Sequence, residues 1–183
     1  MTAGDDSPLV GREPELAALG ELVRMVAEGT GGIGWVRGEP GIGKSALVDA
    51  VADQAKAAGC AVYRGTGDEL AQAFPLRLMA EAFGVSIRSA DPATVTIAQL
   101  LRGEGTAADP VLAAGERLLE HVDRLCAAGP VVLITEDLQF TDEPSLLLWN
   151  RLARAVDQIP LLLLATVLML DAGLKRTLVT TGE

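Results

Sequence analysis

The sequence has few of the side chains that build metal clusters, disulfide frameworks or nucleic-acid interfaces. It contains one histidine and two cysteines, Cys60 and Cys126, without a CxxC spacing or a histidine partner. We therefore interpret both cysteines as reduced, mostly buried thiols. Acidic residues outnumber basic ones, 25 to 15, which gives a formal net charge of −10. Because phosphate contacts need clustered Lys and Arg, we expect no direct nucleic-acid binding by this chain.

The sequence also lacks a hydrophobic run long enough to cross a membrane. The apolar run from Leu161 to Leu170 falls well short of the roughly 20 residues that a span needs. It fits a buried parallel strand better. Residues Met1 to Ser7 are acidic and polar, unlike a secretory leader. These features predict a cytoplasmic protein without a membrane partner.

What remains is a chain suited to one packed α/β domain. Nearly half of its 183 residues are hydrophobic, and aromatic residues are few. Short apolar runs alternate with segments of helical spacing, which predicts a mostly parallel sheet with helices on both faces. The expected helices cover residues 13–28, 45–58, 75–83, 111–128 and 144–156, and the expected strands cover 33–37, 61–66, 131–135 and 161–165.

The same pattern divides the chain into regions. Residues 1–12 are expected to form a leader, 13–170 the folded domain and 171–183 a tail. Within the domain, residues 86–109 mix polar, Gly and Pro residues with one short helical stretch around Ile97 to Leu101. We interpret this segment as a surface insertion.

A phosphate-binding motif follows the first expected strand and opens a helix. It matches GxxxxGK[ST] in full, with the residues Gly38-Glu39-Pro40-Gly41-Ile42-Gly43-Lys44-Ser45. The glycines let backbone amides point inward, and the amino-terminal end of the helix favours anions. Lys44 would supply a cation to the β- and γ-phosphates, Ser45 a hard oxygen for Mg²⁺, and Ala46 continues the site. The predicted fold class is an α/β P-loop NTPase that binds ATP.

Two adjacent acids, Glu136 and Asp137, end the third expected strand. Ligands bind beyond the carboxyl ends of parallel strands, so this pair and the P-loop should share one edge. One acid could hold the hydration shell of Mg²⁺ and the other could orient an attacking water. Neighbouring side chains on a strand point in opposite directions, so each acid has one role. Thr166, after the last strand, either faces the γ-phosphate or simply ends the strand.

Three other residues draw attention for their chemistry. We interpret His121 as a surface residue or one with satisfied hydrogen bonds. Trp35 and Trp149 are expected in the core rather than as stacking platforms.

At this point the chain resembles a known group. Val10-Gly11-Arg12-Glu13-Pro14-Glu15-Leu16 is similar to the amino-terminal box of AAA-like signal-transduction ATPases of the STAND type. The stretch Glu136-Asp137-Leu138-Gln139-Phe140-Thr141-Asp142, followed by Ser145-Leu146, resembles the Walker B region of large ATP-binding LuxR-type regulators. The resemblance covers nearly the whole chain.

The resemblance implies a role for each matching residue. Val10, Gly11 and Arg12 would lie near the adenine and ribose, while Lys44 and Ser45 would hold phosphate and Mg²⁺. Glu136 would take the magnesium-side position, where Asp is usual, and Asp137 the water-activating position. Phe140 stands where Trp is common, and Asp142 would cap the next helix.

One departure from the family concerns the γ-phosphate. An Arg often follows the Thr that ends the last strand, whereas Thr166 is followed by Val167. Arg151 and Arg154 are weak candidates to act on a neighbouring subunit. We expect slow hydrolysis for this reason.

The sequence leaves three functions open. We favour a regulatory switch in which ATP binding and slow Mg²⁺-dependent hydrolysis control a transcriptional regulator, through self-association or regulator domains in cis. A binding module with a decayed ATPase is the second possibility. A small-molecule phosphotransferase is the third, and scattered arginines disfavour it because such kinases usually carry an Arg-rich lid.

Overall fold

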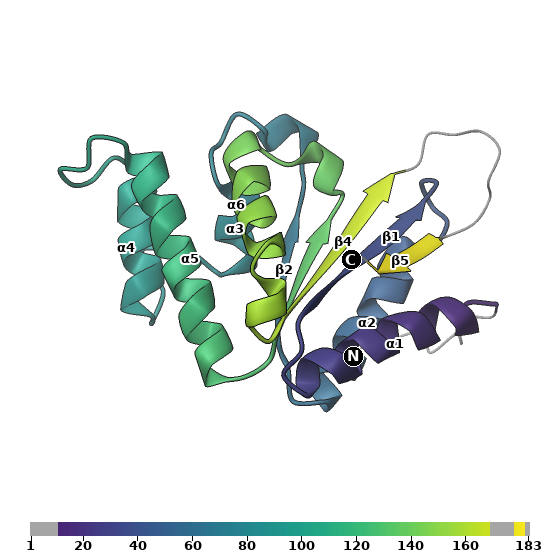
Figure 1. Cartoon of the computed structure of the whole chain (residues 1–183). Coiled ribbons are helices and arrows are strands. Elements are labelled where there is room, and N and C mark those ends of the chain that lie inside the picture. The colour runs from purple at the N-terminus through teal and green to yellow at the C-terminus, as the bar shows by residue number, and fades with distance from the viewer. Residues whose placement is uncertain (1–10, 169–177, 182–183) are drawn as a thin grey trace, which may run out of the picture.

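A central sheet organises the domain. The computed structural model describes residues 11–168 and 178–181. Its five strands lie in the order β2-β3-β4-β1-β5 (Figure 1). The first four in this order are mutually parallel, and the last pairs antiparallel with β1. The strands are β1 Gly32–Gly38, β2 Ala61–Thr66, β3 Val131–Glu136, β4 Leu161–Leu168 and β5 Leu178–Thr181.

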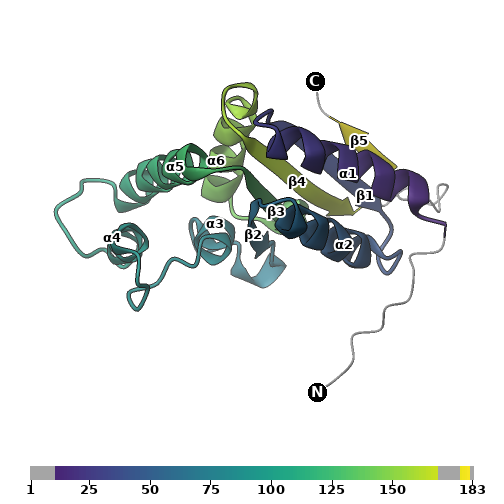
Figure 2. The same cartoon turned by 90° about the horizontal axis from the view of Figure 1, so that it is seen from below.

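Helices cover both faces of this sheet, as the sequence predicts (Figures 1 and 2). Helices α1 and α2 lie on one face, α3, α5 and α6 lie on the other, and α4 packs against α5. The helices are α1 Glu13–Ala27, α2 Lys44–Ala57, α3 Arg77–Ala82, α4 Pro92–Leu101, α5 Pro110–Ala128 and α6 Glu143–Ala153. The α/β fold with its mostly parallel sheet is therefore confirmed.

The two middle strands are buried on both faces. Every residue of β3, and residues 161–166 of β4, are buried. Successive side chains alternate between two cores: Leu133 and Leu163 face α5 and α6, whereas Val132 and Leu162 face α1 and α2. Complete burial of each such side chain contributes about 1.5–3 kcal/mol. Two helical layers are therefore required to keep this sheet out of water.

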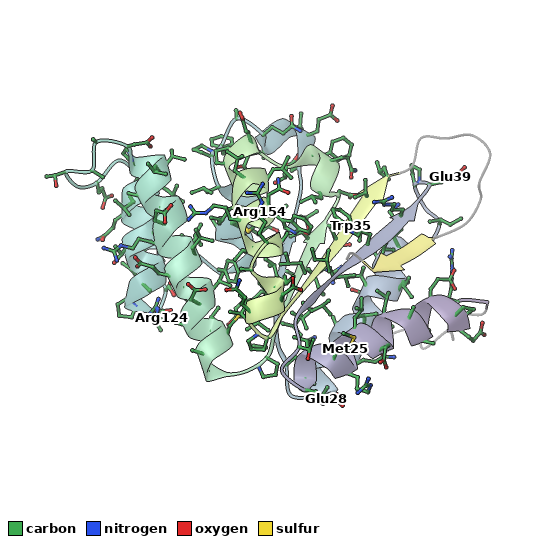
Figure 3. All side chains as sticks on the ribbon, in the orientation of Figure 1. Met25, Glu28, Trp35, Glu39, Arg124 and Arg154 are labelled. Carbon is green, nitrogen blue, oxygen red and sulfur yellow. The ribbon has the colours of Figure 1, made fainter. Side chains whose placement is uncertain are left out.

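Aromatic and thiol side chains complete the cores. Trp149 is buried in the core as predicted, and Trp35 is partly buried against it, with the two rings 5.0 Å apart. Figure 3 shows Trp35 over the sheet, with Glu28 and Arg124 at the surface. Cys60 and Cys126 are free and buried. Burial raises the pKa of the Cys126 thiol to about 11.

Asp142 forms the predicted cap of α6. Its Oδ1 accepts a hydrogen bond from the Ser145 backbone N–H at 2.8 Å. The same oxygen accepts the Leu76 N–H at 2.8 Å. Leu76 has a left-handed backbone, with φ of 59°, immediately before α3. Asp142 thus fixes both the start of α6 and the turn that leads into α3.

Two segments differ from the sequence-based expectations. The segment 86–109 contains a helix, α4, whose Ile97 is completely buried against the core. It is therefore only in part a surface insertion, because α4 packs on α5. Residues 178–181 form β5 against β1, where the sequence suggested only a tail.

The described part of the chain contains no helix that is both long and apolar enough to cross a membrane.

Gly31 offers a test of the packing before β1. A Cβ here would lie against the carbonyl oxygens of Val156, Ile159 and Leu161, the farthest of them at 2.7 Å. We expect Gly31→Ala to lower the free energy of unfolding by roughly 3 kcal/mol, the upper end of overpacking costs. Gly32→Ala is the matched control, because the nearest atom to its Cβ would be a Leu22 methyl at 3.8 Å. Denaturant titrations of both variants test this, and equal stabilities would contradict the packing.

His121 gives the fold a pH dependence. Burial lowers its pKa, although Asp91 opposes this shift, and Arg124 donates to the ring Nδ1 at 3.1 Å. The unfolded chain takes up a proton near the ordinary pKa of about 6.5, whereas the folded protein resists it. Stability should therefore fall as the pH drops below that value. Unfolding titrations at neutral and mildly acidic pH should show this loss in the wild type and a smaller one in His121→Gln.

Candidate functional site

The glycine-rich motif connects the carboxyl end of β1 to the start of α2. Gly41 and Gly43 have φ values of 74° and 92°, a left-handed conformation that strains other residues. Gly43 is also the residue immediately before α2. Residues 38–45 therefore form a tight turn between a strand and a helix, which is the structural context that the motif requires.

Lys44 lies over this loop. Its Nζ donates to the carbonyl oxygens of Gly38 and Glu39, both at 3.0 Å. The residue is 8% exposed. The two carbonyls hold the ammonium group of a largely buried lysine at the centre of the loop, where phosphate oxygens could replace them.

The two adjacent acids point in different directions. Glu136 ends β3 and is buried, and its Oε2 accepts a hydrogen bond from Ser45 Oγ at 3.1 Å. Asp137 has a left-handed backbone, with φ of 48° and ψ of 47°, which Asp tolerates better than most residues. This turn carries the Asp137 carboxylate out of the strand, so only Glu136 contacts the P-loop serine.

Thr166 and Gln139 hold Asp137 in place. The Asp137 N–H donates to Thr166 Oγ1 at 2.9 Å, and Gln139 Nε2 donates to Asp137 Oδ1 at 3.5 Å. Gln139 Oε1 in turn accepts the Leu168 N–H at 3.3 Å. Thr166 lies within β4, which continues to Leu168 rather than ending at residue 165. Its hydroxyl oxygen therefore positions Asp137.

Most of the expected site residues line one open pocket of about 450 Å³. This volume lies within the range of small-molecule sites. The pocket forms because β4 lies between β1 and β3, so the carboxyl ends of all three strands meet. The lining residues are Pro40, Gly41, Gly43, Lys44, Ser45, Glu136, Asp137, Thr166 and Leu168. Gly38, Glu39, Ile42 and Ala46 belong to the same loop and helix start.

The amino-terminal box reaches the P-loop through Arg12. Its Nη2 donates to the Ile42 carbonyl oxygen at 2.7 Å, and its Nη1 pairs with Glu15 Oε1 at 3.2 Å. Gly11 has φ of 81°, and its N–H donates to Glu13 at 3.3 Å. Val10 lies outside the described residues.

Arg151 and Arg154 lie away from this pocket. They come at the carboxyl end of α6, whereas the start of that helix follows the acid pair. Figure 3 shows Arg154 well separated from Glu39. Arg151 pairs with Glu116 at 2.5 Å, beside a mostly apolar groove of about 430 Å³ between α5 and α6. Neither arginine serves the P-loop of its own chain.

Sequence reasoning missed two residues that shape the acid pair. Arg64 of β2 donates from Nε to Glu136 Oε1 at 2.6 Å, and Glu136 and Asp49 together raise the pKa of its guanidinium. The Gly67 N–H donates to the Glu136 carbonyl at 2.8 Å, and a Cβ on Gly67 would collide with the Asp137 carbonyl. The only sequence signal was a charged residue and a glycine at the end of a strand.

The oxygen atoms beside the P-loop fit a magnesium ion that arrives with a nucleotide. Mg²⁺ in phosphate sites commonly takes one or two protein oxygens and completes its shell with phosphates and water. Ser45 and Glu136 offer two such oxygens on facing elements. Within residues 11–168 and 178–181, no group of three or more His, Cys, Asp or Glu side chains could hold a metal by itself.

Comparison with known proteins agrees with this geometry. The profile of the AAA ATPase domain family matches residues 8–164. The chain belongs to this family. The AAA ATPase domain family is a family of nucleotide-binding domains, and its profile spans the glycine-rich loop and the acid pair that line the pocket.

Individual relatives are distant. An uncharacterized protein of Rhizobium meliloti (strain 1021) is 28% identical over 188 aligned positions, which cover 87% of this chain and 18% of that protein. The chain thus spans less than a fifth of that relative. Among solved structures, C. elegans PCH-2 aligns with a TM-score of 0.42 and 13% identity, over 88% of this chain and 38% of that one. A structure of Drosophila ORC bound to GC-rich DNA and Cdc6 aligns with a TM-score of 0.45 and 17% identity. This alignment covers 93% of the present chain and 55% of the other chain.

Lys44 provides the test of the phosphate cradle. Lys44→Ala removes the only cationic side chain among the described residues that line the pocket. A hydrogen bond to a charged group contributes about 1.5–3 kcal/mol, so ATP should bind roughly tenfold to a hundredfold more weakly. Titration calorimetry measures this loss. Lys56→Ala, on an exposed turn of the same helix, is the control, and equal affinities in both variants would contradict the assignment.

Proposed function

We propose that this domain binds ATP with Mg²⁺ and hydrolyses it slowly, as a nucleotide-dependent switch within a larger protein. The observation that supports the proposal is the single pocket shared by the P-loop, both acids and Thr166. Phosphoryl transfer needs phosphate binding, charge neutralisation and a positioned water. The lining residues offer a candidate for each of these.

Each residue has a distinct role in this proposal. Loop amides and Lys44 bind the β- and γ-phosphates, and Lys44 exchanges its carbonyl partners for phosphate oxygens. Ser45 and Glu136 would supply oxygen ligands for Mg²⁺, and the ion would neutralise charge on the phosphates. Asp137 orients a water molecule and accepts its proton as the water oxygen bonds to the γ-phosphorus. The bond between that phosphorus and the ADP oxygen breaks, which releases ADP and phosphate.

The composition of the pocket favours slow turnover. Among its described lining residues the sole cation is Lys44, and no arginine is present. An arginine at the γ-phosphate is worth about 10³–10⁵ in rate. Without one, ATP should persist on the domain long enough to act as a signal. An arginine from a second copy would accelerate turnover, and Arg154, which has no ion pair among the described residues, is the candidate.

The regulatory part of the proposal rests on the Walker B resemblance. The stretch from Glu136 to Asp142, with Ser145, is similar to that of LuxR-type regulators. The chain corresponds to a small part of its Rhizobium relative, so a nucleotide domain inside a longer polypeptide is a reasonable setting. We propose that ATP occupancy controls either the self-association of the protein or the activity of regulator domains in the same polypeptide. Such a role would place the domain in the cytoplasm.

Asp137→Asn tests the catalytic assignment. The substitution replaces the carboxylate by an amide of similar size, which cannot accept a proton from water. Hydrolysis by the wild type should lie well below the roughly 10 s⁻¹ typical of enzymes. The variant should lose about 10²-fold or more, the usual contribution of general base catalysis. Phosphate release at several protein concentrations measures this, with Asp123→Asn on the exposed side of α5 as the control.

The outcomes separate the candidate functions. Fast turnover that does not depend on protein concentration would contradict the switch. ATP binding without any hydrolysis would indicate the binding-only module, which the lack of an arginine in the described lining also favours. A rate per subunit that rises with concentration would indicate an arginine supplied in trans.

A further inference from the structure

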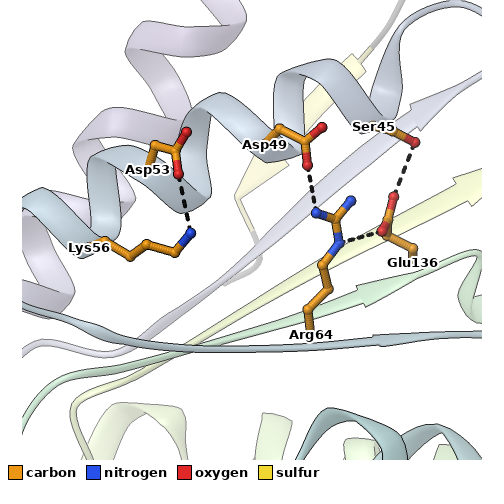
Figure 4. A network of polar contacts seen from close by, with 6 residues as sticks. All are labelled: Ser45, Asp49, Asp53, Lys56, Arg64 and Glu136. Atoms are coloured by element: carbon orange, nitrogen blue, oxygen red, sulfur yellow. Dashed lines mark hydrogen bonds and ion pairs between the residues drawn. The ribbon is translucent and has the colours of Figure 1, made fainter. Parts of the chain in front are cut away.

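A chain of polar contacts links the P-loop helix to two strands. Arg64 of β2 donates from Nη1 to Asp49 Oδ1 at 2.5 Å and from Nε to Glu136 Oε1 at 2.6 Å. Ser45 Oγ donates to Glu136 Oε2 at 3.1 Å. Ser45 and Asp49 lie one turn apart on α2, so both face the strands (Figure 4). The four side chains therefore form a chain of three contacts that begins and ends on α2 and passes through β2 and β3.

Glu136 is the most deeply buried charged group in this chain of contacts. The side chain is 11% exposed, and a buried carboxylate is costly unless it is paired and hydrogen-bonded. Glutamate also carries three side-chain torsions, so burial alone does not determine where its oxygens point. The contact from Arg64 occupies Oε1 and leaves Oε2 directed at Ser45.

Arg64 is held from the other side as well. A guanidinium group is planar, and its donors have a fixed fork geometry. Asp49 engages one nitrogen of this fork while Glu136 engages another. Arg64 is 38% exposed, so the Asp49 contact lies near solvent and the Glu136 contact lies at the pocket. The orientation of Arg64 is thus set by α2, the helix that also carries Ser45.

We propose that Arg64 is a positioning residue for the magnesium side of the nucleotide site. It fixes Glu136 so that one carboxylate oxygen is presented beside the Ser45 hydroxyl. Arg64 does not line the pocket and makes no contact with the P-loop backbone among the described residues. It should therefore control the part of ATP affinity that depends on Mg²⁺, and leave phosphate binding by the loop unchanged. This inference rests on the proposed function.

The test compares ATP affinity with Mg²⁺ and with EDTA, each by titration calorimetry. The dissociation constant in EDTA divided by the dissociation constant with Mg²⁺ measures how much the metal strengthens ATP binding. Arg64→Ala should reduce this ratio about tenfold, as expected for the loss of one hydrogen bond to a charged group. Its affinity in EDTA should stay within about twofold of the wild type, because the loop amides and Lys44 are untouched.

Further variants separate positioning from general stability. Arg64→Lys keeps the charge but cannot engage both carboxylates with a rigid fork. Its ratio of dissociation constants should therefore lie between those of Arg64→Ala and the wild type. Asp49→Asn weakens the contact between Asp49 and Arg64, and should lower the ratio less than Arg64→Ala does. Lys56→Ala breaks the exposed pair between Lys56 and Asp53, one turn further along the same helix, and should leave the ratio unchanged (Figure 4). Thermal unfolding without nucleotide shows whether each variant is folded.

Each result has a defined meaning. An Arg64→Ala ratio equal to that of the wild type overturns the inference. An equal loss of affinity with Mg²⁺ and with EDTA also overturns it, because that is the behaviour of a residue that only stabilises the fold. If Arg64→Ala does not fold, the same criteria apply to Arg64→Lys and Asp49→Asn. A wild type that binds no ATP, or gains nothing from Mg²⁺, contradicts the proposed function itself.

Discussion

The structure depends on the burial of β3 and β4 on both of their faces. Parallel strands that alternate large apolar side chains toward two sides need a helical layer on each side. Leu133 and Leu163 require the α5 and α6 layer, and Val132 and Leu162 require the α1 and α2 layer. The second layer fixes α2 against the sheet, and α2 begins at the P-loop. Core packing thus determines where the phosphate loop meets the acid pair.

Several polar groups of the site already have partners in the structure without a nucleotide. Lys44 is bonded to two loop carbonyls, Glu136 to Ser45 and Arg64, and the Asp137 N–H to Thr166. Binding of phosphate therefore exchanges one set of hydrogen bonds for another. The net gain from such an exchange is smaller than the strength of the new contacts alone. Under the proposed function, nucleotide affinity is therefore the difference between the new contacts to phosphate and the internal contacts of Lys44 that they replace.

Much of the fold followed from local patterns, because strands and helices alternate with clear periodicity. The P-loop followed from its sequence motif, and its proximity to the acid pair followed from the rule that ligands bind where parallel strands end at one edge. Arg64 was not predictable in this way, since its contact with Glu136 depends on the register of β2 against β3 and on the rotation of α2. Helix α4 was only partly recognised, because Ile97 becomes a core residue only once α5 is beside it. Thr166 was placed after its strand, whereas pairing with β1 carries β4 on to Leu168.

The antiparallel strand β5 has a consequence for the P-loop strand. In the parallel part of the sheet, β1 is one of the two outer members, and among the described residues, 178–181 pair along its free side. An uncovered strand presents a row of unpaired N–H and C=O groups, which is a template for pairing with other chains. Strand β5 therefore moves the open edge of the sheet away from the strand that leads into the phosphate loop.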